Sequence, residues 1–162
     1  MLGQPKTAKI YVYEKDTVNV QPTISAIDTI DYKNLEVKKK MAIYFGLLHG
    51  GGSLVGADIE FLIHNHIGLQ VGVGLVGYGF AMNFHFKPDI KSSGISLNYW
   101  HQGIGDSFVQ SLFGSTYVYR SKKWFTFQVG LGVPLDTGPA LPEGTVLPDV
   151  MLLYSIGAYI AM

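Results

Sequence analysis

The stretch from Asp149 to Met162 constrains the fold more than any other part of the sequence. Every even-numbered position from Val150 to Met162 is apolar, whereas the odd-numbered positions mix polar and small residues with Met151 and Leu153. A period of two is that of a β-strand, in which alternate side chains point to opposite faces. The stretch therefore predicts a long strand with one wholly apolar face.

Seven further segments with the same period begin at residue 41. They span residues 41–48, 55–63, 67–76, 78–86, 95–100, 108–120 and 124–133. No helical period appears in the sequence. In the sixth segment we expect one set of side chains to point outward and another inward. The outward set is Phe113, Tyr117 and Tyr119, and the inward set is Gln110, Thr116 and Arg120. Successive strands joined by turns predict an all-β, antiparallel up-and-down barrel of about eight strands.

The connections alternate in kind along the predicted barrel. Short polar turns at 64–66, 87–93 and 121–123 would lie at the end where the barrel starts. Glycine-rich or longer connections, at 49–53, 101–107 and 134–148, would lie at the opposite end. Short turns at one end and looser loops at the other are typical of bacterial outer-membrane barrels, whose strands have similar lengths.

Composition favours a sheet that faces lipid. Charged residues make up 15% of the chain, aromatic residues 13%, and there are 20 glycines. A water-exposed surface normally carries more charge than this. The 12 basic residues balance the 12 acidic ones, which argues against a nucleic-acid partner. The absence of cysteine excludes disulfides and thiolate metal sites, and no apolar run is long enough for a transmembrane helix.

The end of the last predicted strand resembles the C-terminal insertion signal of bacterial outer-membrane β-barrels. The residues that carry the resemblance are Ser155, Gly157, Ile160 and Met162, although the usual terminal Phe is Met here. The resemblance implies a transmembrane barrel in the outer membrane, with a periplasmic N-terminus and contacts to outer-membrane lipid and lipopolysaccharide. Gly3-Gln4 and the Asp16-Thr17-Val18 element are similar to features of envelope proteins in the Bacteroidota.

Residues 1–40 differ in kind from the predicted barrel at 41–162. They are polar and interrupted by proline, and they end in the basic run Lys38-Lys39-Lys40. We interpret them as an extended periplasmic leader that docks onto a protein partner; a solvated tail and a plug inside the barrel are the alternatives. The function we expect is a non-enzymatic structural or accessory subunit of a cell-envelope secretion or assembly complex.

A small set of charged and polar residues falls on the inward face of the predicted strands. It consists of Asp58, Glu60, His85 and Arg120. The interior of an eight-stranded barrel is filled by side chains, and an unpaired buried charge is unfavourable. Arg120 is therefore the expected partner of the two carboxylates. We interpret the set as lumen packing rather than as a proton path or an active site.

Two sequence motifs that suggest ligands are better explained by structure. Gly72, Gly74 and Gly77 match a dinucleotide-binding spacing, but that chemistry requires a strand followed by a helix, and here a second strand follows. His64 and His66 flank a predicted turn and lack a third metal ligand. We therefore expect neither a cofactor nor a metal ion.

His101 is the residue that an enzymatic alternative would use. The stretch from Asn98 to Ser107 faintly resembles the active-site region of outer-membrane lipid A 3-O-deacylases, in which a strand histidine is followed two residues later by the nucleophilic serine. Here that position is Gly103, and Asp106 and Ser107 are the nearby polar residues. The resemblance implies His101 as a catalytic base. A soluble ligand-binding β-barrel is a further alternative.

Overall fold

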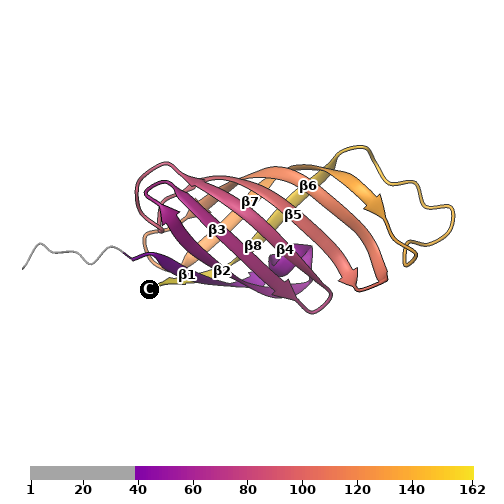
Figure 1. Ribbon diagram of the computed structural model, residues 1–162, viewed down its shortest axis with the longest axis horizontal. Helices are drawn as coiled ribbons and strands as arrows, with labels where there is room; N and C mark the ends of the chain where they lie inside the picture. The colour runs from indigo at the N-terminus through magenta and orange to yellow at the C-terminus, as the bar shows by residue number, and fades with distance from the viewer. Residues whose placement is uncertain (1–38) are drawn as a thin grey trace, which may run out of the picture. The chain divides into compact units, whose positions relative to one another are not determined.

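Residues 39–162 are described by a computed structural model, in which eight antiparallel strands close into a barrel (Figure 1). The strands are β1 (Met41–Leu47), β2 (Val55–His64), β3 (Ile67–Gly74), β4 (Gly77–His85), β5 (Gly94–Ile104), β6 (Ser107–Arg120), β7 (Phe125–Thr137) and β8 (Met151–Ala161). One short helical turn, α1 (His49–Gly52), lies between β1 and β2. The predicted all-β up-and-down barrel is confirmed. Of the predicted leader, residues 1–38 lie outside the described residues.

The barrel closes where the first strand meets the last. β8 pairs with β1 in antiparallel register, from Ala42 opposite Ala161 to Leu47 opposite Ile156. Every other strand pairs with its neighbours in the sequence. We call the end where β1 begins and β8 ends the terminal end, and the opposite one the far end. No helix among the described residues is long and apolar enough to cross a membrane.

Side chains alternate between the outside of the barrel and its lumen, and the apolar set is outside. In β8, Leu152 and Ile160 are 60% and 68% exposed, whereas Ser155 and Tyr159 are buried. Across the described residues, 35 large hydrophobic side chains are exposed and only 10 hydrophobic residues are buried. In β6, the predicted outward and inward sets also lie as expected. The distribution is the inverse of that in a water-soluble barrel.

Two strands are longer than the sequence pattern predicts. β5 continues to Ile104 and β7 to Thr137, so the loops expected at 101–107 and 134–148 were placed too early. The pairing is irregular within both extensions, at Gln102/Gly103 between β5 and β6 and at Ser111/Leu112 between β6 and β7. Such bulges shift the alternation, and the second accommodates Pro134, which lacks a ladder N–H.

The connection between β1 and β2 fills the lumen near the far end instead of forming the simple turn expected at 49–53. Leu48 and the three glycines Gly50, Gly51 and Gly52 have positive φ angles between 58° and 80°. A Cβ on Gly50 would lie 2.2 Å from the backbone of Val73. The glycine run is therefore required both for the backbone conformation and for the close approach to the strands.

The connection between β4 and β5 closes the terminal end. Its residue Ile90 is fully buried. The side chain belongs to a cluster with lumen-facing residues of β1, β2 and β8, namely Ala42, Tyr44, Leu62, Tyr159 and Ala161. The lumen is thus covered from both ends by segments of the chain itself.

Candidate functional site

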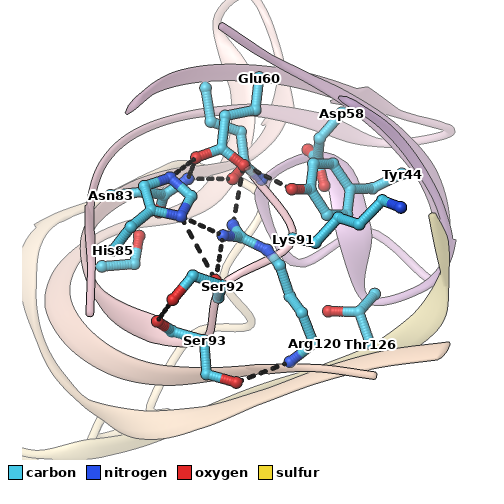
Figure 2. Close-up of polar contacts among 12 residues, drawn as sticks. Tyr44, Asp58, Glu60, Asn83, His85, Lys91, Ser92, Ser93, Arg120 and Thr126 are labelled. Carbon is cyan, nitrogen blue, oxygen red and sulfur yellow. Dashed lines mark hydrogen bonds and ion pairs between the residues drawn. The ribbon is translucent and has the colours of Figure 1, made fainter. Parts of the chain in front are cut away.

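The lumen is organised around the fully buried carboxylate of Glu60 on β2 (Figure 2). Its Oε1 accepts a hydrogen bond from Asn83 Nδ2 at 2.7 Å and lies 2.9 Å from His85 Nε2. Its Oε2 accepts hydrogen bonds from Arg120 Nη2, at 2.7 Å, and from the hydroxyl of Tyr44. Four donors from three strands, β1, β4 and β6, therefore converge on one carboxylate. We call Tyr44, Glu60, Asn83, His85 and Arg120 the Glu60 cluster.

The contacts of Arg120 determine which proton His85 carries. Arg120 Nη1 lies 2.9 Å from His85 Nδ1 and donates to the carbonyl oxygen of Ser92 at 2.9 Å. Nδ1 also lies 3.3 Å from the carbonyl oxygen of Ser92, but its shorter contact is with Arg120. A guanidinium has no acceptor, so in that contact Nδ1 accepts, and Nε2 carries the proton that is donated to Glu60. This network assigns a neutral imidazole. The charges of Glu60 and Arg120 then cancel, which satisfies the requirement that buried charges be paired.

Asp58 does not belong to the Glu60 cluster. It forms a short contact with His49 Nδ1, and its Oδ1 accepts a hydrogen bond from the backbone N–H of Gly50 at 3.0 Å. The other ring nitrogen of His49 lies 3.4 Å from Ser155 Oγ. The structure therefore brings together three of the four predicted lumen residues. The expectation that Arg120 is the partner of Asp58 was wrong.

His49, like Tyr44 and Asn83 of the Glu60 cluster, is a lumen residue that was not among the four predicted from the sequence. It precedes the three glycines of α1, whose positive φ angles turn this connection inward and bring the ring to Asp58. The signal in the sequence was the glycine run itself, which was interpreted as a turn. The contact fixes α1 in the lumen, because it joins that connection to β2.

The residues of the insertion-signal pattern lie on both faces of β8. Ser155 is buried in the lumen, and Gly157 pairs with Gly46 of β1. Ile160 and Met162 are exposed on the outside. The two faces therefore separate the small and polar members of the pattern from its apolar members.

His101 lies on the outside of the barrel, near the far end. Its Nδ1 is 3.0 Å from Ser111 Oγ on the neighbouring strand β6, directly opposite in the register. The rings of Tyr78 and Phe108 lie on either side, each with its centroid 4.7 Å from that of His101. Both polar residues are largely buried by these neighbours. Ser107, the nearby serine in the sequence, is exposed and pairs with Ile104.

The glycine motif at Gly72 and Gly74 and the histidine motif at His66 occupy structural positions in the barrel. Gly72 and Gly74 are strand residues of β3, and a Cβ on Gly72 would lie 1.6 Å from Asp58 Oδ1. His66 contacts the backbone oxygen of His85 at 2.8 Å. Residues 39–162 contain no group of three or more His, Cys, Asp or Glu side chains arranged to hold a metal ion.

Two small voids remain in the lumen between the Glu60 cluster and α1. Each has a volume of about 10 Å³. The first is lined in part by His49 and Asp58, and the second in part by Tyr44 and Arg120. A void of this size holds about one water molecule. The lumen is therefore a packed polar core and not a binding cavity for a larger solute.

Comparison with known proteins identifies no relative. No protein-family model matches the sequence, and no curated protein or solved structure is significantly similar to it. The interpretation of this chain therefore depends on two features of its own barrel. These are the closed lumen with its Glu60 cluster and the apolar outer surface, which carries the His101–Ser111 pair.

Proposed function

We propose that this protein is an outer-membrane β-barrel that acts as a non-enzymatic structural or accessory subunit of a cell-envelope secretion or assembly complex. The observation that carries the proposal is the apolar outer surface, which continues around all eight strands. Soluble monomers rarely expose apolar patches larger than a few hundred Å². A surface of this extent is suited to the hydrocarbon region of a bilayer.

The outward positions of the strands support a membrane more strongly than exposure alone. Within residues 41–161, the outward strand positions carry no Glu, Lys or Arg, and the one Asp among them, Asp136, lies opposite Ser111 near the far end of β7. Their polar exceptions include His101, Ser111 and Ser115. All backbone groups of a closed barrel pair between strands, as a bilayer requires. A soluble ligand-binding barrel would need the opposite arrangement, with a polar exterior and an apolar cavity.

The closed lumen favours a structural role over transport. The Glu60 cluster joins β1, β2, β4 and β6, and the connections on both sides of it are folded inward. A carboxylate held by four donors is rigid and electrically compensated. A protein that moves solutes needs an open path through the barrel or a binding cavity, and neither is built into a lumen packed in this way.

The outer-membrane location is supported by the pattern at Ser155, Gly157, Ile160 and Met162. From this pattern we infer that the terminal end faces the periplasm, and we propose the same compartment for the N-terminal leader. Outer-membrane lipid and lipopolysaccharide would then surround the barrel. The polar leader, residues 1–40, is the part of the chain we propose to contact a protein partner.

Crosslinking in cells tests the proposed partner contact. The full chain is compared with a chain that lacks residues 1–37, and both are recovered from the outer-membrane fraction. We expect deletion of the leader to remove one or more crosslinked proteins while the barrel still migrates faster on gels before heating than after. An unchanged set of crosslinked proteins would contradict a docking role for the leader.

A second candidate function is hydrolysis of an acyl ester in the surrounding lipid, as in the lipid A deacylases. The observation that favours it is the His101–Ser111 contact of 3.0 Å on the outer surface. A base within hydrogen-bond distance of a hydroxyl can remove its proton during attack on an ester. Ser111, rather than Ser107, would be the nucleophile. An acyl-serine would form with release of the alcohol, and water would then release the fatty acid.

Mass spectrometry of lipid A distinguishes this candidate from the structural one. Lipid A from cells with the wild-type protein is compared with lipid A from cells with Ser111→Ala or Ser107→Ala. The hydrolase predicts loss of one acyl chain with wild type and with Ser107→Ala, but not with Ser111→Ala. Identical acylation in cells with and without the protein would eliminate it.

A further inference from the structure

Charged side chains outside the lumen are separated by sign between the two ends of the barrel. The terminal end carries six lysines and one acidic residue, Asp89, within residues 39–162. The far end carries four acidic residues, Asp106, Asp136, Glu143 and Asp149, and in the described part of the chain no Lys or Arg. We call the six lysines the basic rim: Lys39, Lys40, Lys87, Lys91, Lys122 and Lys123.

The basic rim is distributed around the barrel mouth. Its lysines lie before β1, in the connection between β4 and β5, and in the connection between β6 and β7. Lys87, Lys122 and Lys123 are exposed. Positive charge is therefore distributed over several sides of the barrel at its terminal end, and is not gathered in one compact patch.

Large aromatic side chains adjoin the basic rim. Trp124 follows Lys123 and is 60% exposed, and Phe86 precedes Lys87 and is 59% exposed. Exposed aromatic side chains at the ends of membrane strands lie at the level of the lipid headgroups. Because the lysines are next to these residues in the chain, we expect their ammonium groups to lie at the depth of the lipid headgroups. This is the depth at which lipid phosphates occur.

We propose that the basic rim binds the phosphate groups of anionic phospholipids in the leaflet at the terminal end. The proposal rests on the membrane location argued above. A ring of separate lysines beside headgroup-level aromatics fits many small anions arranged in a plane, whereas an acidic protein would need the charges gathered on one surface. Each lysine near an anionic leaflet contributes about 1 kcal/mol of attraction. The acidic far end is repelled by such lipids, so the two ends together favour one orientation.

Quenching of Trp124 by brominated lipids tests this proposal directly. The protein is reconstituted in phosphatidylcholine vesicles that contain increasing mole fractions of brominated phosphatidylglycerol. A second series contains brominated phosphatidylcholine at the same mole fractions. Trp124 is beside the basic rim, and the other tryptophan, Trp100, faces the lumen and is only 7% exposed. We expect half-maximal quenching at a roughly fivefold lower mole fraction of the anionic lipid, the factor that corresponds to about 1 kcal/mol of attraction between one lysine and one lipid. A Trp124→Phe protein identifies the signal.

Two triple variants separate a local site from an effect of net charge. Lys87→Gln/Lys122→Gln/Lys123→Gln should abolish the preference for the anionic lipid. The matched control, Asp106→Asn/Glu143→Gln/Asp149→Asn, changes as many charges at the far end and should keep it. Salt at 1 M, where the screening length is about 3 Å, should remove the preference in the wild type. Each variant is first checked for the heat-dependent gel shift of a folded barrel.

The outcomes distinguish failure of this proposal from failure of the membrane location. Equal quenching by both brominated lipids would overturn anionic lipid binding. Preference retained in the lysine variant would also overturn it. Absence of quenching by either lipid would instead show that Trp124 does not face lipid, and the membrane proposal itself would fail.

Discussion

Removal of the Arg120 side-chain charge should strongly destabilise the barrel. Glu60 is fully buried and receives two hydrogen bonds on each carboxylate oxygen. In Arg120→Met the aliphatic stem is largely kept, but the carboxylate is left with neutral donors only. Removing one partner of a buried ion pair costs about 3–5 kcal/mol. The same change also removes the hydrogen bond to Ser92 in the connection that covers the terminal end.

The double variant Glu60→Gln/Arg120→Met separates the charge from the packing. It leaves no unpaired charge, so we expect it to recover at least about half of the stability lost in the single variant. The free energy of unfolding is measured by urea titration in phospholipid vesicles, with tryptophan fluorescence and the heat-dependent gel shift as readouts. A loss below about 1 kcal/mol for Arg120→Met would refute the reasoning. A double variant less stable than Arg120→Met would do the same.

Three further changes test other parts of the account. Gly72→Ala places a Cβ 1.6 Å from Asp58 Oδ1, so we expect a loss of about 1–3 kcal/mol in the same urea titration; unchanged stability would contradict the lumen packing. Val71→Lys puts a charge on the outer surface of β3 and should cost about 2–4 kcal/mol in vesicles, whereas a water-exposed site would tolerate it. Ile160→Asp alters the insertion-signal pattern and should lower the amount of barrel in the outer-membrane fraction; an unchanged amount would argue against the pattern as a signal.

The barrel was predictable because its alternation is local. In β8 the even positions are all apolar, whereas the odd positions include small and polar residues beside Met151 and Leu153, and this difference separates the outside from the lumen. Strand ends were less predictable, because β5 and β7 continue past bulges that shift the alternation. The periodicity changes at such a point, and it cannot distinguish a bulge from the start of a loop.

The contacts inside the lumen were only partly predictable. The strand pattern placed Glu60, His85 and Arg120 on the inward face, but it contained no register between strands that are distant in the chain. The His49–Asp58 contact depends on a glycine run that turns back into the barrel, and a turn at the surface would have the same composition. The His101–Ser111 contact depends likewise on the register of β5 and β6, which places Ser111, and not Ser107, opposite the histidine.

The central claim is that the even-numbered face of β8 contacts lipid and the odd-numbered face lines a closed lumen. The chain contains no cysteine, so single cysteines can be introduced from residue 152 to residue 160 and spin-labelled without removing a native thiol. In membranes, the account predicts high collision rates with oxygen and low rates with a water-soluble nickel complex at positions 152, 154, 156 and 160. Both rates should be low at 153, 155 and 159. High accessibility of the even positions to the nickel complex would contradict the account, because that face would then be in water.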